Sequence, residues 1–191
     1  MLFGIAGPTA SGKTTVTEVL TGEYGAAYMR YSEILADIAT KHRLDATDKT
    51  TLQNLFVTLR EERGEDWLAK EIAARAKALA APHLVIEGNR RKVDLKTLTD
   101  VANARGEKLM FIFIDASPDT RFIRYNGRLE RQGKTPITRE AFTVLEQNPA
   151  EDEVDVLRKY SQTNGVCIDT DTYNIEETKV LLENMLKKIA L

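Results

Sequence analysis

Short apolar runs alternate along the chain with longer amphipathic stretches, and this alternation predicts a parallel β-sheet covered by helices. The five candidate strands are residues 2–6, 26–29, 83–87, 108–115 and 166–169. The fourth run is uninterrupted from Leu109 to Ile114, which is typical of a central strand that is buried on both faces. The expected architecture is therefore an α/β fold with crossover helices.

Helical periodicity fills the segments between these runs. Apolar residues recur at spacings of three and four, which predicts helices over residues 13–24, 50–63, 67–80 and 175–189. Side chains typical of helix caps mark three starts: Thr50 with Gln53, Ser117 followed by Pro118, and Asn174 with Glu177.

Composition narrows the class of protein. A chain of 191 residues fits one domain, expected to span residues 1–191. Lys and Arg number 27 against 29 Asp and Glu, a balance that argues against a surface built wholly for nucleic acid. Cys167 is the single cysteine, which excludes an internal disulfide and favours a reduced, cytoplasmic setting. The first apolar run is too short to cross a bilayer, so we expect no membrane segment.

Residues 7–14 read GPTASGKT and match the phosphate-binding pattern G-x-x-x-x-G-K-[ST]. Gly7 and Gly12 allow backbone N–H groups to turn inward around a phosphate. Lys13 adds a positive charge, and the hydroxyl of Thr14 is a ligand for Mg²⁺. The motif follows a predicted strand and opens a predicted helix, so we expect a nucleoside triphosphate site here.

A basic stripe lies between residues 121 and 139, with six cations against one acid. Arg121, Arg124, Arg128 and Arg131 are spaced by three, four and three residues, which places them on one face of a helix. Arginines gathered in this way stabilise the charge of a transferring phosphoryl group, so we interpret the stripe as a lid. A solvated helix face and a nucleic-acid surface remain open as alternatives.

The third predicted strand ends in Glu87, followed by Arg90. Ligands of open α/β sheets lie beyond the carboxyl ends of the strands. We expect Glu87 to hold Mg²⁺ through water or to accept a proton, and Arg90 to bind an acceptor phosphate or to pair with Asp94. Arg30 and Arg60 are further candidates for the same phosphate.

Together these motifs resemble the P-loop nucleoside monophosphate kinase family, in its small adenylate-kinase-like and dephospho-CoA-kinase-like branch. The resemblance implies a P-loop NTPase three-layer sandwich, with a five-stranded parallel sheet, helices on both faces and an Arg-rich lid. It also implies ATP and Mg²⁺ as cofactors and a small nucleotide-like acceptor. An acceptor-binding helical segment is expected at about residues 32–81 and the lid at about 124–139, in a monomer or homodimer.

The resemblance also implies roles for individual residues. The catalytic candidates are Lys13, Arg124, Arg128 and Glu87. The cofactor-binding candidates are Gly7, Ala10, Ser11, Gly12, Lys13, Thr14, Thr15, Arg124, Thr170 and Asp171, the last two within the 170–173 loop that lines the adenine pocket. The metal candidates are Thr14 and Glu87. The acceptor-binding candidates are Arg30, Ser32, Arg60 and Arg90.

One position departs from the family. The family pattern Ser-x-x-Leu-Arg reads here from Ser32 to Ala36, so an alanine stands where an arginine holds the acceptor phosphate. Either Arg30 or Arg60 replaces that arginine, or the acceptor group is not a standard monophosphate.

Three functions follow, in order of preference. The first is transfer of the γ-phosphoryl group of Mg-ATP to a (deoxy)nucleoside monophosphate. The second is transfer to a hydroxyl acceptor, such as dephospho-CoA or a nucleoside, with Glu87 as the base. The third is an ATPase switch whose basic stripe holds nucleic acid, an outcome that we expect less.

Overall fold

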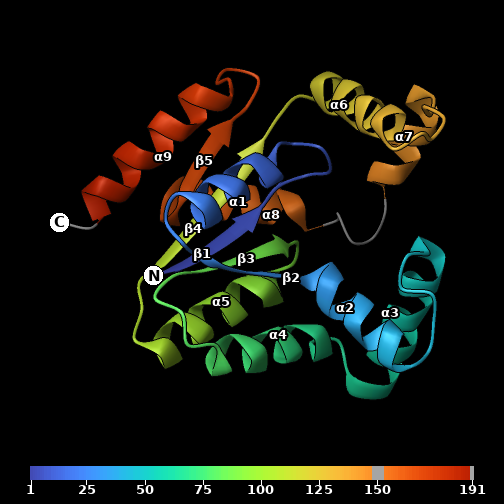
Figure 1. Cartoon of the computed structure of the whole chain (residues 1–191), viewed down its shortest axis with the longest axis horizontal. Coiled ribbons are helices and arrows are strands. Elements are labelled where there is room, and N and C mark those ends of the chain that lie inside the picture. The colour runs from blue at the N-terminus through green and yellow to red at the C-terminus, as the bar shows by residue number, and fades with distance from the viewer. Residues whose placement is uncertain (148–152, 190–191) are drawn as a thin grey trace.

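Five parallel strands form one sheet in the order β2-β3-β1-β4-β5 (Figure 1). The structure is a computed structural model that describes residues 1–147 and 153–189. The strands are β1 (Leu2–Ala6), β2 (Ala27–Arg30), β3 (Leu84–Asn89), β4 (Leu109–Asp115) and β5 (Val166–Asp169). Each predicted strand is present, with its ends moved by at most two residues, and the predicted P-loop NTPase fold is confirmed.

Helices surround the sheet. They are α1 (Lys13–Gly22), α2 (Tyr31–Lys41), α3 (Lys49–Arg63), α4 (Trp67–Ala78), α5 (Lys92–Arg105), α6 (Pro118–Arg131), α7 (Arg139–Glu146), α8 (Val154–Asn164) and α9 (Ile175–Ile189). The sequence pattern does not single out α2, α5, α7 or α8. Among the described residues, none of the helices combines the length and the apolar character that a membrane span requires.

Two apolar clusters hold the layers together, one on each face of the sheet. The first contains residues of α1 and α9, and the second contains residues of α2, α3, α4, α5 and α8. In Figure 1 the pairs α2–α3 and α6–α7 lie at the end of the sheet to which the strand arrows point. Helices α2, α3, α6 and α7 therefore lie beyond the carboxyl ends of the strands, whereas α4, which completes the segment 32–81, packs against α5.

The carboxyl end of β3 contains an irregularity that positions the site. Ile5 of β1 pairs with Glu87, but the next residue of β1 pairs with Asn89, so Gly88 is an extra residue in β3. Gly88 has φ +92°, which a residue with a side chain rarely adopts. Beside this bulge, the side-chain Nδ2 of Asn89 donates to the carbonyl oxygens of Ile5 and Ile86 (2.9 and 2.8 Å).

Two of the three predicted caps are confirmed. The hydroxyl of Ser117 accepts a backbone N–H at the start of α6, and Asn174 and Glu177 accept each other's backbone N–H groups before α9. The prediction for Thr50 is wrong, because this residue lies within α3. The carboxylate of Asp48 accepts the backbone N–H three residues later and is the cap.

Arg105, at the end of α5, binds the C-terminal end of the neighbouring helix α4. Its guanidinium donates to the carbonyls of Ala76, Leu79 and Ala81 (2.7, 2.6 and 2.6 Å) and to Glu107 (2.9 Å). Ala76 lies in the last turn of α4, and Leu79 and Ala81 follow it, so Arg105 adds a charged donor at a helix end where few backbone donors are available. A side chain that is only 9% exposed thus satisfies the end of a neighbouring helix.

We predict that Arg105→Met lowers the free energy of unfolding by about 2–4 kcal/mol, because several carbonyls lose a charged donor at once. Urea unfolding measures the loss. The matched control is Lys96→Met, also on α5, whose side chain is 76% exposed and pairs with Asp100. That change should cost less than about 0.5 kcal/mol. Equal stability of the two variants would contradict the role of Arg105.

Candidate active site

The loop from β1 to α1 is built from unusual backbone conformations. Gly7, Ala10 and Gly12 have φ of +143°, +62° and +104°. A Cβ on Gly7 would lie 2.1 Å from the carbonyl oxygen of Ile114, so the loop is pressed against the end of β4. The glycines were expected from the motif, whereas the left-handed Ala10 was not. The result is a loop whose backbone is fixed before any ligand enters.

Lys13 folds back over this loop. Its Nζ donates to the carbonyl oxygens of Gly7 and Pro8 (2.8 and 2.7 Å). Burial and the nearby charge of Arg90 lower the pKa of Lys13 to about 7, although Glu87 acts in the opposite direction. A phosphate in the loop would favour the charged lysine again.

A second set of bonds joins the loop to the opposite end of the chain. The carbonyl oxygen of Ser11 accepts from Thr170 Oγ1 (2.8 Å) and from Arg124 Nη1 (3.4 Å). Ser11 is fully buried, and its hydroxyl has no hydrogen-bond partner among the described residues. The phosphate loop, α6 and the segment after β5 thus meet at one carbonyl.

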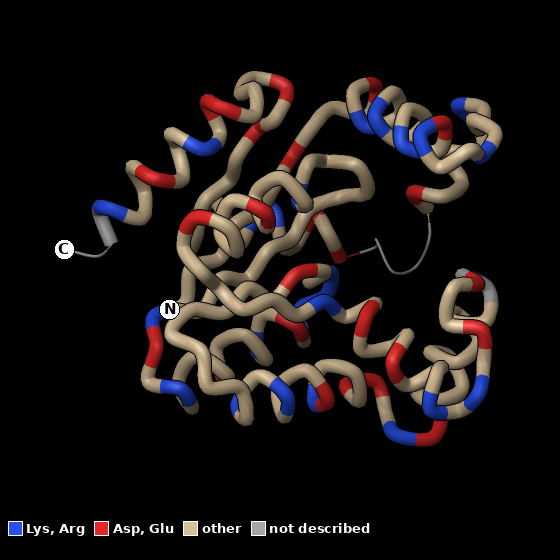
Figure 2. Tube along the Cα trace, viewed as in Figure 1, with Lys and Arg blue, Asp and Glu red and all other residues tan. Residues whose placement is uncertain are grey.

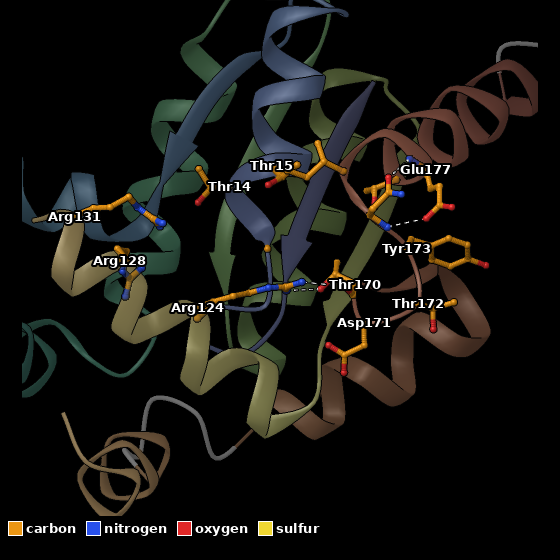
Figure 3. Close-up of a pocket in the computed structure, with 15 residues that line it drawn as sticks. Thr14, Thr15, Arg124, Arg128, Arg131, Thr170, Asp171, Thr172, Tyr173 and Glu177 are labelled. Carbon is orange, nitrogen blue, oxygen red and sulfur yellow. Dashed lines mark hydrogen bonds between the residues drawn. The ribbon is translucent and has the colours of Figure 1, made fainter. Parts of the chain in front are cut away.

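A cavity of about 770 Å³ opens beside this junction (Figure 3). Its lining comes from the phosphate loop and α1, from α6, and from the segment that leads into α9. The residues are Ala10, Gly12, Thr14, Thr15, Arg124, Arg128, Arg131, Thr170, Asp171, Thr172, Tyr173, Asn174, Ile175, Glu177 and Thr178. Most of the residues expected to bind the cofactor therefore surround one space.

Arg124 and Asp171 fix the walls of this cavity. Arg124 donates to the hydroxyl and to the carbonyl oxygen of Thr170 (2.7 and 2.9 Å), as Figure 3 shows. The carboxylate of Asp171 instead accepts the backbone N–H of Ser117 (2.7 Å). Hydrogen bonds from Ser117 and Thr120 hold the pKa of Asp171 below its usual value. Asp171 lines the cavity, yet its carboxylate is bonded to the backbone at the start of α6.

The basic stripe is divided in the structure, although Figure 2 shows its cations gathered on α6 and α7. Arg124, Arg128 and Arg131 line the cavity, but Arg121 is 7% exposed and pairs with Glu146 of α7. Its guanidinium also lies 5.9 Å from the ring centroid of Phe142. Including Arg121 in the ligand-facing stripe was wrong, because α7 covers it, and α7 was not predicted.

Glu87 is held on the α1 face of the sheet by three groups. Its Oε2 accepts from the hydroxyl of Tyr28 (2.8 Å) and from that of Thr17 (3.4 Å), and its Oε1 lies 3.6 Å from Arg30 Nη2. The carboxylate is almost completely buried. Tyr28 and Thr17 were not identified from the sequence, because neither belongs to a local motif.

A second cavity, of about 370 Å³, lies between α1 and the edge strand β2. It is lined by Thr14, Thr17, Glu18, Thr21, Ala26, Tyr28, Arg30 and Glu87. Thr14 lines both cavities. Thr14 and Glu87 thus border one space with room for water, and oxygen donors with water are the surroundings that Mg²⁺ prefers. These residues fit a magnesium ion.

The acceptor candidates do not all converge. Arg30 lies beside Glu87, and its charge and that of Arg90 act on Lys13. Burial and the charge of Arg30 lower the pKa of Arg90. Arg60 instead lies 3.4 Å from Glu65, at the end of α3. Of the two proposed replacements for the arginine missing at Ala36, it is therefore Arg30 that lies at the loop.

Two further expectations concern neighbouring residues. Asp94 caps α5, because its Oδ2 accepts the backbone N–H groups of Arg90 and Arg91 (2.8 and 2.9 Å). The contact of Asp94 with Arg90 is thus a hydrogen bond to the backbone N–H of Arg90. Ser32 lies in the first turn of α2 and is exposed to solvent.

Comparisons with known proteins agree with this geometry. The family model described as "AAA domain" matches residues 6–143. Among solved structures, a proposed kinase from Chloroflexus aurantiacus has a TM-score of 0.57 at 15% identity, covering 98% of this chain and 96% of that one. TT1252 from Thermus thermophilus has a TM-score of 0.56 at 18% identity, covering 98% and 97%. No curated protein sequence matches this chain.

We predict that Gly7→Ala abolishes nucleotide binding and lowers the free energy of unfolding by about 1–3 kcal/mol, because the new Cβ collides with a backbone carbonyl. A fluorescent ATP analogue and urea unfolding provide the two measurements. The control is Gly22→Ala in α1, where a Cβ meets nothing within 4 Å. It should bind nucleotide normally and be equally or slightly more stable. Normal binding by Gly7→Ala would refute the assigned loop geometry.

Proposed function

The chain belongs to the AAA domain family, a P-loop kinase-like family, and from this premise we propose that it is a nucleoside monophosphate kinase-like phosphotransferase. Mg-ATP is the proposed donor of the γ-phosphoryl group, and a (deoxy)nucleoside monophosphate is the proposed acceptor. The larger cavity is the proposed ATP site, and about residues 124–139, from within α6 to the first residue of α7, are its proposed lid. Residues 32–81 are the proposed acceptor-binding segment.

One observation carries this proposal. Lys13 is bonded to the loop carbonyls, Arg128 lines the larger cavity and Arg30 lies 3.6 Å from Glu87. Burial, and then the charges of Arg90, Arg30 and Arg128, lower the pKa of Lys13. Like charges brought together at a partly desolvated site repel one another unless anions neutralise them. A nucleoside triphosphate and a second phosphate supply several negative charges at the same place. The arrangement therefore favours a substrate pair in which both members carry phosphate.

The surroundings of Glu87 favour a phosphate acceptor over a hydroxyl acceptor. A general base must have an oxygen within hydrogen-bond reach of the acceptor hydroxyl. One oxygen of Glu87 already accepts from Tyr28 and Thr17, and the other faces Arg30. An ionised phosphate acceptor needs no base. Its oxygen forms the new bond to the γ-phosphorus while the bond to the β-phosphate oxygen breaks, and no proton has to move.

Catalysis then consists of positioning and of charge neutralisation. The backbone of the loop and Lys13 bind the phosphates of the donor. Arg128 lines the ATP cavity and stabilises the charge of the transferring group. Arg124 holds Thr170 in place, in the part of the cavity wall proposed to contact the nucleoside. Arg30 and Arg90 bind and orient the acceptor phosphate.

Thr14 and Glu87 are the residues that would hold magnesium, Thr14 directly and Glu87 through water. When bound, the ion neutralises phosphate charge and orients the donor. The chain's own contribution is to keep Thr14 and Glu87 at one space, since both residues line the cavity between α1 and β2.

We predict that ADP release from Mg-ATP is stimulated by nucleoside monophosphates, and that Lys13→Met lowers this turnover by about 10²–10³-fold. The assay uses ribo- and deoxynucleoside monophosphates, nucleosides and dephospho-CoA as acceptors. Stimulation by a hydroxyl acceptor alone would replace the proposed acceptor class, and slow release that no acceptor stimulates would favour the ATPase switch.

We predict that Arg90→Met raises the KM for the acceptor by about 10–100-fold, the loss expected for one charged hydrogen bond, with the KM for ATP nearly unchanged. Arg60→Met is the matched control, because Arg60 pairs with Glu65 away from the loop. Its acceptor KM should stay within about twofold of the unmodified chain. A larger effect of Arg60→Met than of Arg90→Met would move the acceptor to the α3–α4 corner.

A further inference from the structure

The closest contact of Glu87 comes from a residue outside the phosphate loop, the lid and the acceptor segment. We infer that Tyr28 is a positioning residue, which holds the Glu87 carboxylate in the orientation that binds the water shell of the nucleotide-bound divalent cation. This inference rests on the proposed function, because it assigns a determinant of cation binding within the same site.

The three contacts of Glu87 differ in strength. The Tyr28 hydroxyl donates to Oε2 at 2.8 Å, whereas Thr17 Oγ1 lies at 3.4 Å, close to the limit for a hydrogen bond. Arg30 lies at 3.6 Å, and its side chain is 41% exposed. The short bond from Tyr28 is therefore the contact that best defines where the carboxylate points.

The backbone around Tyr28 is itself fixed. In the sheet register Tyr28 pairs with Val85, and Arg30 pairs with Glu87. The ring of Tyr28 packs against the cluster formed by α1 and α9. A donor built on a strand and packed against the core has little freedom to leave its acceptor.

The position of the cavity connects Tyr28 to the cation. Tyr28, Glu87 and Thr14 all line the space between α1 and β2. Thr14 is also part of the wall of the larger cavity, where the donor phosphates are proposed to bind. A cation at Thr14 would therefore have its water shell in the space that Tyr28 and Glu87 border.

The test measures Mn²⁺ binding by electron paramagnetic resonance, in the presence of saturating non-hydrolysable ATP analogue. Tyr28→Phe removes only the hydroxyl and should weaken Mn²⁺ binding by about fivefold, the loss expected for one hydrogen bond. The matched control is Tyr24→Phe. Tyr24 is half-buried and packs against the same cluster, but its neighbouring charges are Glu183 and Glu23. This control should bind Mn²⁺ like the unmodified chain.

A double-mutant cycle separates positioning from a general structural role. Glu87→Gln should weaken Mn²⁺ binding at least as much as Tyr28→Phe, and adding Tyr28→Phe to Glu87→Gln should weaken it no further. The inference is overturned if Tyr28→Phe binds Mn²⁺ normally, if Glu87→Gln does so, or if the effect of Tyr28→Phe persists in the Glu87→Gln background.

The kinetic readout is distinct. With a monophosphate acceptor, Tyr28→Phe should lower kcat and raise the Mg²⁺ concentration for half-maximal rate, with the acceptor KM unchanged. If the unmodified chain shows no acceptor-dependent turnover, the proposed function fails, while the Mn²⁺ measurements still decide the role of Tyr28.

Discussion

Repulsion among cations at the carboxyl ends of β1 and β3 is the constraint on which the rest of the site depends. Burial, and then the charges of Arg90, Arg30 and Arg128, lower the pKa of Lys13. The fold tolerates this crowding because the lysine is bonded to two loop carbonyls and because Glu87 is buried close by. The site thus has a surplus of positive charge, which is relieved either by loss of the Lys13 proton or by binding of an anionic ligand.

The order of the strands places two groups of residues on opposite sides of the phosphate loop. Residues on the β4–β5 side, together with α6, enclose the larger cavity. Residues on the β2–β3 side hold Glu87 and the arginines proposed for the acceptor. The phosphate loop follows β1, which lies between β3 and β4, and therefore faces both groups. A reaction between two phosphate-bearing molecules needs this arrangement, because each molecule must approach the loop from its own side.

The sequence was most informative where chemistry depends on neighbouring residues in the chain. The phosphate loop, the acid near the end of β3 and the cap of α9 each lie within a short motif. The glycines of the loop and the cap of α9 are as predicted, whereas the left-handed Ala10 and the continuation of β3 beyond Glu87 were not predicted. Arg121 shows where this reasoning fails, since its helical spacing is right but α7 covers it. Tyr28 and Asp171 show the same limit. Their partners are 59 and 54 residues away in the chain, and only the fold brings them together.

The bonds of Thr170 have a consequence for the energetics of the whole chain. They join Ser11 of the phosphate loop to a residue 159 positions later, just before α9. Any local unfolding that detaches β5 and α9 must break these bonds and open the wall of the larger cavity. A ligand that fills the cavity binds only while that wall is in place, so mass action makes the ligand oppose this opening. Occupancy of the cavity and slow hydrogen exchange in α9 are, for this reason, two measures of one equilibrium.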